Sequence, residues 1–174
     1  MIEKHIANIE VPFIQHSLEN FSKYKKDIVK CVVDEAVPNI FERNLKCLRT
    51  PWHIIKYDCI KWLGDQIVAL LYEHDKLNEG TFVVDEIWGA LYEGKNGSGL
   101  HKHYPASWST VAYIDCPIGS GQTVWPDIQK NITPIDGDVC IFPGWLKHYA
   151  EPSAEGVRRI IVSCNIYPKR SNNQ

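Results

Sequence analysis

The sequence predicts a mainly β protein whose helices are confined to the N-terminal half. Two observations support this class. Apolar residues recur near helical spacing within the first 80 residues, and from Thr81 onward short β-rich runs are separated by glycine and proline. Short strands with this punctuation are typical of a sandwich or barrel. We therefore expect two helices that pack against a β-rich barrel.

The N-terminal half is expected to hold one strand and two helices. An edge strand is predicted over residues 2–13, and a first helix over residues 18–36 ends before Pro38. A second helix is predicted over residues 57–74, because its apolar residues form one stripe, and Glu79-Gly80 should end it. That stripe comprises Ile60, Leu63, Ile67, Leu70 and Leu71.

The C-terminal half is expected to form the barrel. Its predicted strands cover residues 82–92, 107–115, 123–125, 131–134, 138–142 and 157–167. We expect one domain over residues 1–168, with residues 1–80 as helical support and residues 81–168 as the β core. Residues 169–174 are polar and should form a frayed tail.

Composition excludes several classes of protein. The chain has 174 residues, 44% hydrophobic and 23% charged, as in ordinary globular domains, and its net charge of −2 gives no reason to expect nucleic acid as a partner. No apolar run is long enough to cross a membrane. Six scattered cysteines without a CxxC pair, and an N-terminus without a secretory signal, predict a reduced cytoplasmic protein. We expect a monomer or a homodimer.

Three histidines form the leading candidate site. His101 and His103 are two positions apart, so on a strand they would point to the same face. His148 follows another predicted strand through the turn Pro143-Gly144. Because imidazole is the commonest metal ligand, these three side chains predict a metal site.

Several motifs follow one another in a fixed order between about Glu86 and Pro168. Tyr92 precedes His101 by nine residues, and a basic residue follows His148 by ten or eleven. Between them stand Ser109-Thr110-Val111-Ala112-Tyr113-Ile114-Asp115, Gly121-Gln122-Thr123-Val124-Trp125-Pro126 and the run from Thr133 to Phe142. Together these motifs resemble the prolyl-4-hydroxylase-like branch of the Fe(II)- and 2-oxoglutarate-dependent oxygenases. They also resemble small oxygenases of this class from phage and marine bacterial genomes.

The resemblance implies a double-stranded β-helix, the jelly-roll barrel that cupins share. It implies Fe(II) held by the histidines, 2-oxoglutarate and O2 as co-substrates, and room for ascorbate as a further cofactor. The expected reaction is hydroxylation of a peptidyl side chain or a small molecule. If the chain is phage-encoded, it would act in the host cytoplasm.

The family's His-x-Asp pattern is replaced here by His101-Lys102-His103. Three interpretations follow. His103 is the third ligand, or water or chloride takes that position, or a carboxylate comes from elsewhere, with Asp115 the nearest in sequence. We favour His103, because its spacing from His101 puts both imidazoles on one face.

Strand alternation separates the two neighbouring arginines. Arg159 shares a face with Ser163, whereas Arg158 belongs to the opposite face. An interior carboxylate site should carry the polar set, which selects Arg159 for 2-oxoglutarate, with Ser163 or Tyr92 as a hydrogen-bond partner.

Aromatic residues are dense near the motifs. Trp108 and Trp145 are expected on loops beside the metal ligands, where they could line the mouth for substrate, whereas Trp88 is expected to pack in the core.

Two alternatives remain open at this point. Cupins also have His-x-His followed by a Gly-x5-Pro turn and a histidine, and Gly137, Pro143 and His148 fit that pattern. However, Trp145 replaces the second glycine, and the glutamate expected after His-x-His is missing. The chain could thus be a cupin-type dioxygenase, or a non-catalytic module whose histidines hold a structural metal in a closed site.

Overall fold

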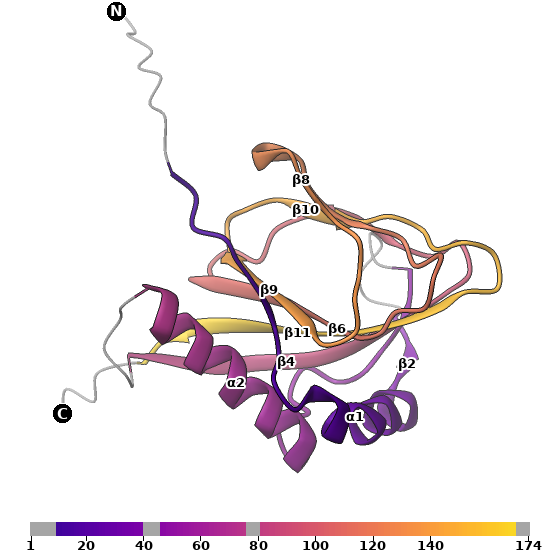
Figure 1. The fold of residues 1–174 in the computed structure, drawn as a ribbon, viewed down its shortest axis with the longest axis horizontal. Coiled ribbons are helices and arrows are strands. Elements are labelled where there is room, and N and C mark those ends of the chain that lie inside the picture. The colour runs from indigo at the N-terminus through magenta and orange to yellow at the C-terminus, as the bar shows by residue number, and fades with distance from the viewer. Residues whose placement is uncertain (1–9, 40–45, 76–80, 170–174) are drawn as a thin grey trace, which may run out of the picture.

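The computed structural model describes residues 10–39, 46–75 and 81–169, and within these ranges it is mainly β with two α-helices. Two antiparallel sheets of seven and four strands face each other, and both helices lie on the outer side of the larger sheet (Figure 1). None of the described helices is long and apolar enough to span a membrane. The predicted class, mainly β with N-terminal helices, is confirmed.

The larger sheet has the order β1-β9-β6-β11-β4-β3-β2. In chain order these strands are β1 (Ile14–Ser17), β2 (Val37–Pro38), β3 (Leu48–Arg49), β4 (Phe82–Glu93), β6 (Trp108–Asp115), β9 (Asp138–Pro143) and β11 (Arg158–Pro168). The smaller sheet has the order β5-β10-β7-β8. Its strands are β5 (Ser98–His101), β7 (Thr123–Trp125), β8 (Lys130–Ile132) and β10 (His148–Ala150), with a 3₁₀ turn at Pro126–Ile128.

Strand β11 divides the core into two layers, because successive side chains on a strand point to opposite faces. Ile160 and Val162 belong to the apolar cluster that packs against α1 (Phe21–Glu35) and α2 (Asp58–Asp75). Ile161 belongs to a second cluster, which lies between the two sheets. The larger sheet therefore has one face for stability and one face that borders the interior of the barrel.

The N-terminal half contributes more than helical support. Residues 10–13 are not in a strand; β1 begins at Ile14 and pairs with β9, so the predicted edge strand lies several residues too early. Strands β2 and β3 also come from this half and extend the larger sheet beyond β4. The remainder of that predicted strand, at residues 2–9, and the helix end at Glu79-Gly80 lie outside the described residues, as does most of the tail.

Two strands of the smaller sheet, β5 and β10, have no counterpart among the predicted strands. Both are short, and β5 contains Gly99, so neither shows an apolar alternation. Their hydrogen-bonded partners supply the stability that local propensity lacks.

Helix α1 packs tightly against β4 at Gly89. A Cβ atom added to Gly89 would lie 2.5 Å from a methyl carbon of Val32, which is fully buried. We expect Gly89→Ala to lower the free energy of unfolding by about 1–3 kcal/mol through overpacking, measured by urea denaturation. In the background of Val32→Ala the added methyl group should cost much less, and equal costs in both backgrounds would contradict this contact.

Candidate metal centre and adjoining cavity

The pairing of β5 with β10 places two of the three histidines opposite each other. His101 and His148 are partners in register, and their ring centroids are 4.3 Å apart. His103 lies two residues beyond the end of β5, where its backbone N–H donates to the carbonyl of Gly144 at 2.7 Å. This bond holds the third histidine beside the turn that precedes β10.

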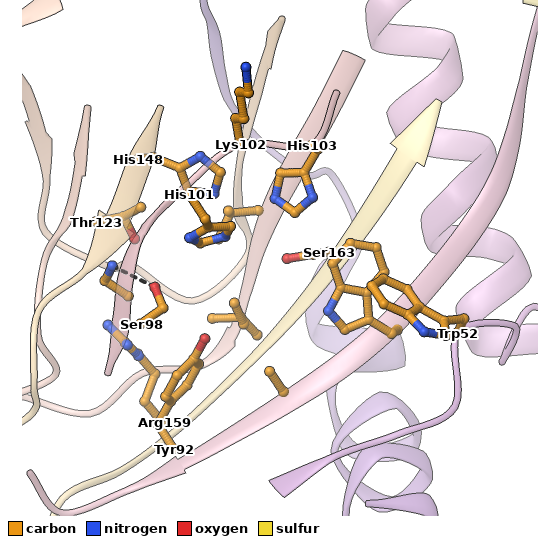
Figure 2. Close-up of a pocket in the computed structure, with 15 residues that line it drawn as sticks. Trp52, Tyr92, Ser98, His101, Lys102, His103, Thr123, His148, Arg159 and Ser163 are labelled. Carbon is orange, nitrogen blue, oxygen red and sulfur yellow. Dashed lines mark hydrogen bonds between the residues drawn. The ribbon is translucent and has the colours of Figure 1, made fainter. Parts of the chain in front are cut away.

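The three imidazoles form one cluster, in which the candidate ligand atoms all lie within 4.8 Å of one another (Figure 2). The Nδ1 atom of His101 lies 2.8 Å from the carbonyl oxygen of Gly99, and that of His148 lies 3.3 Å from the carbonyl oxygen of Leu146. When Nδ1 donates to a carbonyl, Nε2 keeps its lone pair for a metal. The donor set therefore fits a divalent transition metal.

Burial keeps two of these imidazoles in the form that binds metal. Burial, with a smaller contribution from the nearby His101, lowers the pKa of His103 to about 3. Burial also lowers the pKa of His148 well below its ordinary value, again with a contribution from His101. Both side chains are therefore neutral at pH 7 without a metal.

A cavity of about 380 Å³ opens beside the cluster. One end is polar and the other end is aromatic, with Trp52 and Trp88 (Figure 2). The polar side chains that line it, apart from the histidines, are Tyr92, Ser98, Lys102, Thr123, Arg159 and Ser163.

Arg159 lies at the polar end and is almost completely buried, with 1% exposure. It is in register with Tyr92 on β4, and its guanidinium carbon lies 4.6 Å from the centre of the Tyr92 ring. One nitrogen donates to the carbonyl of Gly121, while the buried Nε and Nη2 have no hydrogen-bond partner in the described structure. Because a buried guanidinium without partners is costly, these N–H groups suit an anionic ligand.

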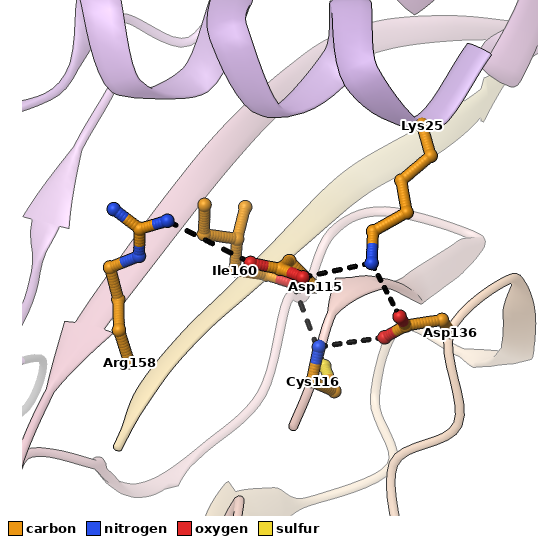
Figure 3. Close-up of polar contacts among 6 residues, drawn as sticks. All are labelled: Lys25, Asp115, Cys116, Asp136, Arg158 and Ile160. Atoms are coloured by element: carbon orange, nitrogen blue, oxygen red, sulfur yellow. Dashed lines mark hydrogen bonds and ion pairs between the residues drawn. The ribbon is translucent and has the colours of Figure 1, made fainter. Parts of the chain in front are cut away.

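The neighbouring arginine points to the opposite face, as strand alternation predicts. Arg158 is exposed, and its Nη2 lies 3.8 Å from one carboxylate oxygen of Asp115 (Figure 3). The other carboxylate oxygen of Asp115 lies 2.9 Å from Nζ of Lys25 on α1. Lys25 bridges further to Asp136 at 2.6 Å. Since Asp115 is paired on the helix side of the sheet, it does not belong to the histidine cluster. No carboxylate joins the histidine cluster among the described residues.

The tryptophans are arranged differently from the prediction. Trp108 is the first residue of β6 and packs in the core cluster beside the helices. Trp145 is half-exposed. Neither tryptophan is among the residues that line the cavity. Trp88, expected only in the core, lines the cavity with Trp52. The alternation of β4 could have found Trp88, which shares a face with Tyr92. No sequence signal marks Trp52, because tertiary contacts alone bring it there.

Comparisons with known proteins find solved structures of the same fold. The sequence matches no protein-family model and no curated protein. The fold matches a viral collagen prolyl hydroxylase from Paramecium bursaria Chlorella virus-1, in its 2-oxoglutarate complex, with a TM-score of 0.70 and 13% identity over 88% of this chain and 94% of that one. A Pseudomonas putida prolyl-4-hydroxylase matches with a TM-score of 0.67 and 15% identity over 91% and 92% of the two chains.

HygX from Streptomyces hygroscopicus, with nickel, 2-oxoglutarate and hygromycin B bound, matches with a TM-score of 0.69 and 11% identity. The alignment covers 91% of this chain and 84% of HygX. The fold is thus the double-stranded β-helix predicted from the sequence, and its structural neighbours include prolyl hydroxylases and proteins solved with 2-oxoglutarate bound.

The low pKa of His103 makes the stability of the metal-free fold depend on pH. Between pH 6.5 and about 3 the unfolded chain binds a proton that folded His103 does not, so the free energy of unfolding rises with pH in this window. In the presence of a chelator, we expect His103→Asn to lose less stability than the parent between pH 7 and pH 5, by up to about 2 kcal/mol. Equal losses, measured by urea denaturation, would contradict the burial of this imidazole.

Removing the buried ligand tests the cluster directly. We expect His148→Ala to weaken divalent metal binding more than about 100-fold, since loss of even an outer partner of a metal ligand costs 10–100-fold. Metal content measured after dialysis, with circular dichroism to confirm folding, checks this. His16→Ala, remote from the cluster, is the matched control. A folded His148→Ala protein that retains one metal ion per chain would show that the site lies elsewhere.

Proposed function

We propose that this chain is a non-haem Fe(II)- and 2-oxoglutarate-dependent oxygenase that hydroxylates a peptidyl side chain or a small molecule. One observation carries the proposal: a cluster of three imidazoles and a buried arginine with two unpartnered nitrogens line the same cavity. Binding of 2-oxoglutarate requires a metal, which the imidazoles would hold, and a cationic partner for its distal carboxylate, which the arginine would provide. The likeness to oxygenases of the same fold supports this interpretation.

His101, His103 and His148 would hold the iron. When bound, Fe(II) together with 2-oxoglutarate and O2 supplies the oxidising power that breaks an unactivated C–H bond of the substrate. His103 would be the third ligand in place of a carboxylate, because its ring centroid lies 5.1 Å from those of both other histidines. The ligand set would then be neutral.

Arg159 would bind the distal carboxylate of 2-oxoglutarate through its two unpartnered nitrogens. Ser163 lines the cavity from the same face of β11, and Tyr92 packs against the guanidinium, so both would complete the site. The surrounding side chains are apolar, among them Val111 and Ile161, and they limit access of water to the reacting groups.

The cupin-type and structural-metal alternatives find no such support. A closed structural site needs a fourth protein ligand, and the cluster contains three among the described residues. Neither alternative gives a role to Arg159, a charged residue buried beside the cavity.

The two neighbouring arginines provide a matched pair of variants. We expect Arg159→Lys to raise the dissociation constant of 2-oxoglutarate about 10- to 100-fold, because lysine keeps the charge but loses the paired hydrogen bonds. Metal binding should be unchanged. Arg158→Lys should have little effect, since that side chain is on the helix side of the sheet. The opposite pattern in calorimetric titrations would show that the face assignment of β11 is wrong.

An anaerobic titration tests the proposed function as a whole. Addition of 2-oxoglutarate to the Fe(II)-loaded protein should produce a visible metal-to-ligand charge-transfer band, and exposure to O2 should convert 2-oxoglutarate to succinate. The His148→Ala protein should show neither. If the folded parent protein gives no band and no succinate, it is not an oxygenase of this class.

A further inference from the structure

The cavity has an unusual balance of charge. Arg159 and Lys102 line it, and no aspartate or glutamate lines it among the residues that the structure describes. The histidine cluster adds no compensating negative charge, because it contains no carboxylate in this part of the chain. The protein therefore presents a wholly neutral or cationic lining to whatever enters.

Together with the proposed function, on which this inference rests, the balance of charge favours an anionic substrate. A divalent metal on three neutral imidazoles keeps both of its charges, and the two carboxylates of 2-oxoglutarate neutralise them. Although one of these carboxylates pairs with Arg159, the positive charges of the metal, Arg159 and Lys102 together exceed the negative charge of 2-oxoglutarate, so a net positive charge remains inside and at the edge of the cavity. A positive field of this kind attracts anions and disfavours cations.

The aromatic end of the cavity indicates that the ligand also has an apolar part. Trp52 and Trp88 meet edge to face, with ring centroids 4.6 Å apart, and Trp88 lies 5.7 Å from the ring of His103. The metal-binding cluster is thus continuous with an aromatic wall, against which an apolar ring can pack.

This wall is held rigidly by β4. The backbone N–H of Ile87 donates to the carbonyl of Trp52 at 2.8 Å, and the N–H of Thr50 donates to the carbonyl of Gly89 at 3.0 Å. The guanidinium carbon of Arg49 lies 3.3 Å from the centre of the Trp52 ring and so supports one side of it. A preformed surface of this kind binds a complementary group without the cost of ordering a loop.

Lys102 lies at the edge of the same cavity, beside the histidine cluster (Figure 2). It stands between two of the histidines in sequence, is exposed, and extends away from the cluster at the rim of the cavity (Figure 2). Its Nζ lies 5.8 Å from the centre of the exposed Tyr104 ring, with no carboxylate within ion-pair distance among the described residues. The flexible stem allows this ammonium to reach a ligand at the rim.

We propose that the substrate is an organic anion with an apolar ring, the ring packed against Trp52 and Trp88 and the anionic group paired with Lys102 at the rim. The hydroxylated carbon then lies on the apolar body, between the wall and the histidine cluster. Cationic compounds of the same shape are excluded by charge.

A matched series of three probes tests this proposal: 3-phenylpropanoate, its neutral amide, and 3-phenylpropylamine. Each is titrated calorimetrically into anaerobic protein loaded with Fe(II) and saturating 2-oxoglutarate. We expect the carboxylate to bind about tenfold more tightly than the amide, as one charge-assisted hydrogen bond allows, and the amine to bind most weakly. The charge-transfer band is recorded throughout, because its persistence shows that the probe has not displaced 2-oxoglutarate.

Variants test which residues cause the preference for the carboxylate probe. Lys102→Met should remove the difference between carboxylate and amide, whereas Lys23→Met, an exposed lysine on α1, should retain it. Trp52→Ala should weaken all three probes together. The proposal is overturned if the carboxylate fails to bind at millimolar concentration, if the amine binds as tightly as the carboxylate, or if Lys102→Met keeps the preference. A missing charge-transfer band would instead refute the proposed function itself.

Discussion

The pairing of β10 with β5 is the constraint on which the candidate site depends. It brings His148 into register with His101, although the two residues are 47 positions apart in the chain. The segments around β10 fit closely because Gly121 has no side chain: a Cβ there would lie 2.0 Å from the carbonyl oxygen of Glu151. The carbonyl of the same glycine accepts a hydrogen bond from Arg159. The closure of the smaller sheet and the position of Arg159 are therefore coupled through one backbone contact.

The alternation of β11 separates stability from function within one strand. Its outward side chains, such as Ile160 and Val162, are fully buried against the helices and stabilise the fold. Its inward side chains include Arg159 and Ser163, which face the cavity. Burying a guanidinium with unpartnered nitrogens costs stability. The apolar face of the same strand offsets this cost, and the anion that the arginine binds would remove it.

The ion pairs of Lys25 on the outer face of the larger sheet affect the charge of the barrel interior. Lys25 joins Asp115 and Asp136, while Arg158 approaches Asp115 from the end of β11 (Figure 3). These charges draw the acidic side chains near β6 toward α1 and away from the barrel interior. The interior is left without a carboxylate among the described residues, so the charge of a bound metal and of the basic side chains must be balanced by ligands. The proposed preference for an anionic substrate rests on the same arrangement, which leaves the cavity without a carboxylate among the described residues.

The sequence by itself determined the class of fold and the bounds of both helices to within a few residues, and it singled out the three histidines and the arginine that line one cavity. These follow from local periodicity: the i, i+2 spacing of His101 and His103, and the alternation that distinguishes Arg159 from Arg158. Only the tertiary structure decided that Asp115 faces the helices, that Trp108 packs in the core, and that Trp52 joins Trp88 at the cavity. Strands β5 and β10 also escaped prediction, because their pairing partners rather than their own residues stabilise them. Periodicity reports which face of an element a residue occupies, but which element lies opposite that face is set by long-range packing that no local pattern encodes.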